Sequence, residues 1–174
     1  MFLMISQLLA NPILGLSWIF GLILAITIHE FAHAFMADRL GDPTPRLQGR
    51  LTLNPLAHLD PIGTLMLLLT RFGWGKPVQF DPFNLQNPRR DAAIISLAGP
   101  VSKLATATLS AGIIRMAPAF SILLLPLIVL SVSLALFNLI PIHPLDGGKI
   151  ILGLLPHGLA SEWDRIRQQY GLII

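Results

Sequence analysis

The chain contains no cysteine and few charged residues for its length. The absence of cysteine excludes disulfide bonds and thiolate metal ligands, so a metal ion would have to be bound by histidine and carboxylate side chains. Of the 174 residues, 53% are hydrophobic and 12% are charged, whereas a soluble domain carries about 25% charged residues. Together with a mean hydropathy of +0.70, this composition predicts an integral membrane protein, and the length predicts a single polytopic domain, 1–174.

The excess of basic over acidic residues is small, with a formal net charge of +3. Most of the basic residues lie between the long apolar runs, so they bear on the orientation of the chain in a membrane, and no nucleic-acid partner is expected. No basic segment precedes the first apolar run, so the sequence does not predict a cleaved signal peptide there.

Three apolar runs are long enough to cross a hydrocarbon core of about 30 Å. They cover about residues 13–37, 92–114 and 118–140. A fourth run, about 62–70, is too short to span and predicts a re-entrant or buried piece. Residues 46–53 alternate well enough to favour a short strand. The predicted fold class is therefore an all-α membrane protein, with a three-span transmembrane core, a short re-entrant or β-like segment and an unwound loop that carries Asp146.

The first apolar run contains a His-Glu-x-x-His pattern formed by His29, Glu30 and His33. On a helix the two histidines lie one turn apart on the same face, which lets two imidazoles share one zinc ion. A single histidine in an apolar helix is more often a hydrogen-bonded structural residue. Three ionisable groups within five residues of a membrane span are costly to bury, however, so the pattern predicts a functional metal site.

Asp146 is the candidate for a third ligand. It follows two prolines and precedes two glycines, and an irregular segment of this kind at membrane depth is tolerated only where protein or a watery cavity surrounds it. An even number of spans must separate Asp146 from His33 if the two are to meet, and the second and third runs supply two. This topology puts nearly all basic loops on one side, which predicts a multi-pass protein of the cell membrane, with those loops and the site cytoplasmic and the N-terminus outside.

Gly99 and Pro100 interrupt the second run and should break or kink its helix. They lie eight or nine residues from the polar end of that run, roughly 13 Å, which is also the depth of His29 below the end of the first run. Lys103 follows near mid-depth. The histidine pair, the Gly-Pro pair and Asp146 are thus predicted to meet at one level of the membrane.

Two histidines and one carboxylate leave the fourth position of a tetrahedral zinc site open, which is typical of catalytic zinc. Glu30 would take a proton from the attacking water and pass it to a leaving amine. One Zn²⁺ per chain would stabilise the negative charge that develops on the carbonyl oxygen. The residues therefore predict hydrolysis of an amide bond.

Taken together, the motifs resemble those of the site-2 proteases, which are intramembrane zinc metalloproteases, in their compact prokaryotic branch. The resemblance runs from about residue 25 to residue 156 and rests on residues 29–33, 98–100 and 138–148, with 54–58 as a further match. It implies zinc ligation by His29, His33 and Asp146, catalysis by Glu30, and a place beside the active site for Asn138. It also implies a lipid bilayer as the setting and the transmembrane helix of another protein as the substrate.

One position departs from the family's pattern. The family usually has asparagine as the last residue of Gly-Pro-x-x-Asn, where this chain has Lys103. Lys103 is either a lysine that reaches water and has no role, or a group that pairs with Asp146 or supports the oxyanion. His143, three residues before Asp146, is a further candidate ligand, although its proline-flanked loop gives it no predictable direction.

Two other kinds of function fit part of the pattern. A metal transporter would spread carboxylates and histidines along a path through several spans, whereas here only the site cluster and Lys103 are immersed. A catalytically inactive zinc-binding scaffold would not need Glu30. A soluble metalloprotease with a membrane anchor is disfavoured because the chain has no sizeable polar domain. The apolar end of the chain is compatible with a further C-terminal span, which the family commonly has.

Overall fold

The computed structural model describes residues 11–63, 66, 75–156 and 158–159. Within these residues the named elements are all helices. The long helices are α2 (Pro12–Arg39), α5 (Pro88–Met116) and α6 (Ser121–Asn138). The short elements are α3 (Thr44–Leu47), η1 (Pro55–Ala57), η2 (Pro82–Asn84), η3 (Pro118–Phe120) and α7 (Asp146–Leu154).

The three predicted spans are confirmed as helices. Each is long and apolar enough to cross a membrane, at Pro12–Arg39, Pro88–Met116 and Pro118–Asn138, the last of which joins η3 to α6. Large apolar side chains remain uncovered along them, such as Leu109, 69% exposed, and Leu136, 61% exposed. An apolar surface of this extent needs lipid or another apolar partner. The chain is therefore a membrane protein.

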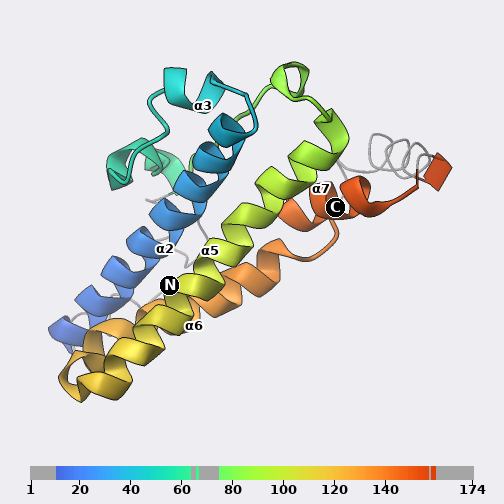
Figure 1. The fold of residues 1–174 in the computed structure, drawn as a ribbon. Helices are drawn as coiled ribbons and strands as arrows, with labels where there is room; N and C mark the ends of the chain where they lie inside the picture. Colours follow the sequence, from blue (N-terminus) through green and yellow to red (C-terminus); the bar gives the residue numbers. More distant parts are fainter. Residues whose placement is uncertain (1–10, 64–65, 67–74, 157, 160–174) are drawn as a thin grey trace.

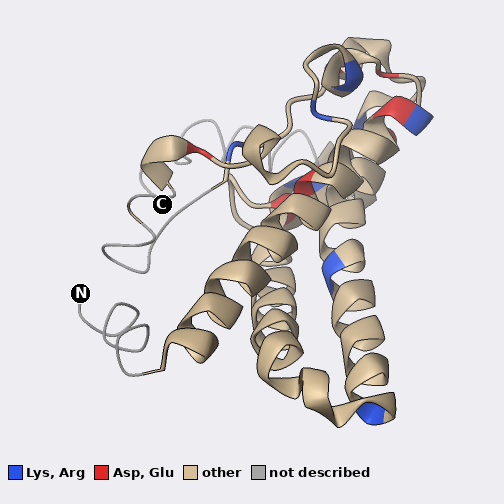
Figure 2. Cartoon of the chain, turned by 90° about the vertical axis from the view of Figure 1, so that its left-hand side faces the viewer, with Lys and Arg blue, Asp and Glu red and all other residues tan. Residues whose placement is uncertain are grey.

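The long helices form one bundle, in which α2, α5 and α6 each contact the other two and lie side by side (Figure 1). The backbones of α2 and α6 approach closely at Gly21, where a Cβ atom would lie 3.0 Å from the backbone nitrogen of Leu127. Small residues permit such approaches between membrane helices. Lys, Arg, Asp and Glu gather toward one end of the bundle, as Figure 2 shows.

The segments on either side of residues 64–74, namely 40–63 and 75–87, are called the cap here. The cap follows the C-terminal end of α2 and precedes α5. Asp42 ties it together, because this fully buried carboxylate accepts hydrogen bonds from the Thr44 backbone and hydroxyl, the Asn84 amide and the Asp81 backbone. A small apolar cluster of Ala37, Leu85 and Ile95 joins the cap to α2 and α5.

The strand predicted at 46–53 is wrong. Residues 44–47 form α3 instead, and the chain then turns through Gly49, whose φ is +68°. Pro45 in the first turn favours a helical start, and the Arg50 N–H bonds back to the Pro45 carbonyl at 2.8 Å. This local hydrogen bonding outweighs the alternating pattern. Of the piece predicted at 62–70, residues 62, 63 and 66 are helical, and the rest lies outside the described residues.

Candidate metal centre

The two histidines of α2 point toward the same place. His29 and His33 are 6% and 8% exposed, and their Nε2 atoms lie 3.1 Å apart. Their rings meet edge to face, with centroids 4.4 Å apart. The four-residue spacing places both side chains on one face of α2, as expected from the helical repeat. Two nitrogens therefore converge on one point inside the protein.

Helix α5 sets the orientation of one imidazole. The Nδ1 atom of His33 lies 2.8 Å from the backbone oxygen of Ile95. A carbonyl oxygen only accepts, so Nδ1 carries the proton and the lone pair of a neutral His33 is on Nε2. A hydrogen bond of this kind from the far nitrogen is the usual support of a metal-binding histidine.

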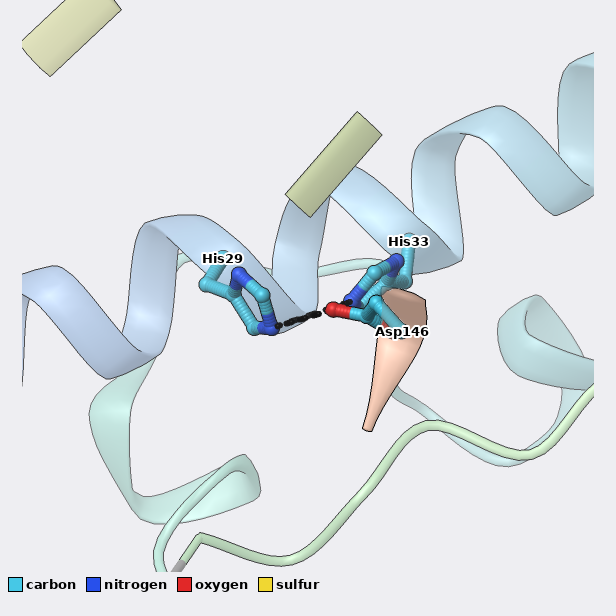
Figure 3. A group of neighbouring side chains, drawn as sticks. All are labelled: His29, His33 and Asp146. Atoms are coloured by element: carbon cyan, nitrogen blue, oxygen red, sulfur yellow. Dashed lines mark hydrogen bonds and ion pairs between the residues drawn. The ribbon is translucent and has the colours of Figure 1, made fainter. Parts of the chain in front are cut away.

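Asp146 completes the group from α7, of which it is the first residue. Its Oδ2 atom lies 3.3 Å from Nε2 of His29 and 3.3 Å from Nε2 of His33 (Figure 3). Among the described residues these three form a cluster that could hold a metal ion, with ligand atoms within 4.8 Å of one another. The segment before Asp146 is irregular, as predicted, but the aspartate itself stands just beyond it at a helix start.

The spacing of these atoms fits zinc. A tetrahedral site with zinc bonds of about 2.0–2.1 Å has neighbouring ligand atoms about 3.3 Å apart, close to the separations of 3.1 and 3.3 Å. Oδ2 of Asp146 is buried yet has no hydrogen-bond partner among the described residues. When both histidines present the lone pair of Nε2, the three facing lone pairs repel unless a cation lies between them, so this arrangement suits a cation at its centre.

Gly99 of α5 covers the two imidazoles at close range. A Cβ atom there would lie 2.4 Å from Cε1 of His29 and 2.5 Å from Nε2 of His33. The structure thus brings Gly99 to the depth predicted for it. Of the predicted break or kink, the break does not occur, because α5 continues through Pro100. The Ser102 hydroxyl donates to the Gly99 carbonyl at 2.7 Å, and such side-chain hydrogen bonds help membrane helices to accommodate proline.

Two close packing contacts hold Asp146 in place. A Cβ atom at Gly147 would lie 2.3 Å from the Ile140 carbonyl oxygen, so the loop after α6 folds directly over the start of α7. At the other end of α7, a Cβ atom at Gly153 would lie 2.2 Å from Cβ of Ala93. Arg89 of α5 also donates from Nε to the Leu152 carbonyl at 2.8 Å. α7 therefore docks on the same helix that carries Gly99.

Glu30 lies next to His29 in the sequence, and its carboxylate is bound to the cap. The Val78 N–H donates to Oε2 of Glu30 at 2.8 Å. Sequence reasoning missed this contact, as it missed the Ile95 carbonyl, because a backbone group gives no sequence signal. Glu30 is half-buried.

Neither Lys103 nor Asn138 forms a hydrogen bond or ion pair with the three candidate ligands His29, His33 and Asp146. Lys103 is 3% exposed and forms no ion pair or hydrogen bond with any described residue, so the predicted pairing with Asp146 is absent there. It is on the same face of α5 as Gly99, one turn further along. Asn138 is the half-buried last residue of α6. His143 is exposed and lies outside the cluster of described metal-ligand candidates.

Known proteins resemble this chain over most of its length. The sequence model of peptidase family M50 matches residues 115–173. A Bacillus subtilis protein named "Putative zinc metalloprotease YwhC" is 38% identical over 165 residues, which cover 88% of this chain and 75% of that protein. A Mycolicibacterium smegmatis protein named "Putative zinc metalloprotease Rip2" is 35% identical over 168 residues, 88% of this chain and 62% of that protein.

The Mycobacterium tuberculosis protein of the same name, strain H37Rv, is 34% identical over 138 residues, 73% of this chain and 52% of that protein. The chain thus spans less than two thirds of the length of both mycobacterial relatives. No solved structure matches it.

Proposed function

Because the chain belongs to the site-2 protease family, peptidase family M50, and is a metalloprotease, we propose that it is an intramembrane zinc endopeptidase. Its substrates are membrane proteins, which it cleaves within or near their transmembrane segments. The whole chain, 1–174, acts as one polytopic domain in this proposal. The observation that carries it is the convergence of three possible ligand atoms, Nε2 of His29, Nε2 of His33 and Oδ2 of Asp146, beside a span.

In this proposal His29, His33 and Asp146 hold one zinc ion and leave its fourth position for water or substrate. Zinc bound there would polarise the scissile carbonyl and make the attacking water acidic enough to lose its proton near neutral pH. The relatives' names support zinc for this site. The donor set supports it as well, because two imidazoles and one carboxylate are a common ligand set of catalytic zinc.

Glu30 is the proposed catalytic base. It accepts the proton of the attacking water and delivers it to the leaving amine nitrogen. Its Oε2 atom is occupied by the Val78 N–H at 2.8 Å, which leaves the other oxygen for this transfer. A carboxylate held in one orientation aligns the proton transfer better than one that rotates freely.

The position of the site supports a membrane substrate. His33 precedes the end of α2 by six residues, roughly 9 Å along the helix, so the site lies near one end of a span. A peptide bond inside a helix is shielded by its own turns, so a substrate helix must unwind to reach the site. The positive-inside rule favours a cytoplasmic location for this end, in the cell membrane, with the N-terminus outside.

Supporting roles are proposed for four residues around the site. Gly99 and Pro100 shape the α5 surface against the imidazoles, and Asn138 lies near the substrate at the end of α6. Side chains on a helix lean toward its N-terminus, so the Lys103 ammonium extends toward the turn that contains Gly99. Lys103 also experiences the charges of Glu30 and Asp146. It therefore adds positive charge near the carbonyl oxygen that becomes negative.

The test replaces Glu30 by glutamine, which keeps an oxygen for the Val78 N–H but cannot accept the proton. The purified variant and the parent are reconstituted with a single-span reporter whose transmembrane segment contains a glycine pair. The glutamine variant should retain its zinc and cleave the reporter at least about 100-fold more slowly, the usual minimum contribution of a general base.

Asp146→Asn serves as the companion variant. It should lose both zinc and cleavage, because an amide is a poorer zinc ligand than a carboxylate. Cleavage by Glu30→Gln at the parent's rate would refute the role of Glu30. Zinc transport by parent proteoliposomes without any reporter cleavage would favour a transporter and overturn the proposed function.

A further inference from the structure

A segment of the cap, residues 75–78, contacts Glu30 and is hydrogen-bonded to two other parts of the protein. The Lys76 N–H donates to the His58 carbonyl at 2.8 Å, and an isolated antiparallel bridge joins Gly75 to Leu59. The Arg50 guanidinium donates from Nη2 to the Lys76 carbonyl. The Val78 N–H then donates to Glu30.

The backbone geometry links the last two contacts. Lys76 and Val78 are two residues apart, and their backbone groups meet Arg50 and Glu30 respectively. Pro77 between them has a fixed φ, which limits independent movement of the two residues. A shift at Lys76 is therefore transmitted to the Val78 N–H.

Arg50 is an unusual residue to find at this place. It is 4% exposed, and its Nε is buried without a hydrogen-bond partner among the described residues. No described carboxylate lies within ion-pair distance of it. Burial lowers the pKa of Arg50, while the negative charge of Glu30 acts in the opposite direction. A buried cation is costly unless a nearby opposite charge offsets it, and Glu30 supplies that charge.

We infer that Arg50 is a positioning residue for the catalytic step: it holds Lys76, and through it the Val78 N–H that fixes the Glu30 carboxylate. This inference rests on the proposed role of Glu30. The terminal torsion of a glutamate is broad, so a free carboxylate samples many orientations. With Oε2 bound to Val78, the second oxygen keeps one direction, and a catalytic group must be held within about 0.5 Å of its productive position.

The first experiment measures the contact without any substrate. Amide hydrogen exchange of peptides that contain residues 75–81 is followed by mass spectrometry in the zinc-loaded protein. Arg50→Met removes the donor and the charge but keeps an unbranched side chain, and it should raise exchange at Val78. Arg46→Met is the matched control, because Arg46 is an exposed cap residue that pairs with Asp38 instead. Unchanged exchange in Arg50→Met would overturn the inference.

The second experiment separates positioning from substrate binding. Arg50→Met should lower kcat on the single-span reporter by roughly 10- to 100-fold, the cost of misplacing a catalytic group by about 1 Å. KM and zinc content should stay at the parent's values, and Arg50→Lys should restore part of kcat. A raised KM with unchanged kcat would mean that Arg50 contacts substrate, and it would overturn the inference while the proposed function stands.

A backbone variant gives the same test without touching Arg50. Val78→Pro removes the N–H that reaches Glu30, and Gln79→Pro stiffens the chain at the next residue but leaves that N–H in place. Only Val78→Pro should lower kcat. Equal kcat in both proline variants and the parent would overturn the inference. A parent that never cleaves the reporter would count against the proposed function, and the exchange measurement would still decide the contact.

Discussion

Replacing Gly99 by alanine puts a methyl group where the two imidazoles proposed to bind zinc now lie. The added Cβ would be 2.4 Å from Cε1 of His29 and 2.5 Å from both Cε1 and Nε2 of His33. Non-bonded carbon atoms pack about 3.5–4.0 Å apart. Each ring must therefore move away by roughly 1 Å, or α2 and α5 must separate by a similar distance.

A displacement of this size is large for a metal site. Zinc–nitrogen bonds are about 2.0–2.1 Å long, and a working site keeps its distances within about 0.2 Å. We therefore expect Gly99→Ala to weaken zinc binding at least as much as the loss of a supporting hydrogen bond does, roughly 10- to 100-fold. Cleavage of the reporter should fall in parallel at limiting zinc.

The assay is a competition titration of the detergent-purified protein against a chromophoric zinc chelator. Gly112→Ala is the matched control on the same helix, since a Cβ atom at Gly112 meets nothing within 4 Å. Both substitutions gain the same helix propensity, about 1 kcal/mol, so a difference between them reports the contact. Zinc affinity in Gly99→Ala equal to that of Gly112→Ala and the parent would refute the packing argument.

Two further predictions concern buried charged residues. Lys103→Asn introduces the asparagine that is usual in the family and removes a positive charge near the developing oxyanion. It should lower kcat about 10-fold or less with zinc retained. Unchanged kcat in the reporter assay would show that the lysine has no role. Burial alone would raise the pKa of Asp42, but hydrogen bonds from Thr44, Asn84 and the Asp81 backbone outweigh it and hold that pKa below its ordinary 3.8. The folded state therefore binds the proton less readily than the unfolded state, so the free energy of unfolding should be highest above about pH 4 and fall as the pH drops further. Asp42→Asn should lose this part of the pH dependence and about 1–3 kcal/mol of stability. Thermal unfolding from pH 3 to 7 measures both. A pH profile equal to the parent's would contradict the assignment of this pH dependence to Asp42.

The spans and the candidate ligands follow from the sequence for reasons that are local. A charge-free run of twenty or more apolar residues has one stable form in a bilayer, because a helix alone satisfies all its backbone groups. The helical repeat then places His29 and His33 on one face without reference to the rest of the fold. Counting the spans between His33 and Asp146 predicts that the aspartate lies on the same side of the membrane.

Other features could not be predicted because they depend on contacts between distant segments. The alternation in 46–53 favours a strand, yet no described strand lies beside it to pair with, and Asp42, just before α3, is bound instead to Asp81 and Asn84 across the cap. Gly99 and Pro100 predict a break or a kink, but α2 packs against the glycine and α5 stays continuous. A one-dimensional pattern contains no information about these neighbours.

By itself the sequence determined which residues are candidates for the chemistry, because their types and spacing follow from zinc coordination and the membrane's cost for buried charge. Only the tertiary structure decided how these residues are held. The Ile95 carbonyl that orients His33, the Val78 N–H that binds Glu30 and the guanidinium of Arg50 come from segments far away in the chain. Backbone donors and acceptors are the same at every residue, so only the packing of the helices and the cap determines which of them reach the site.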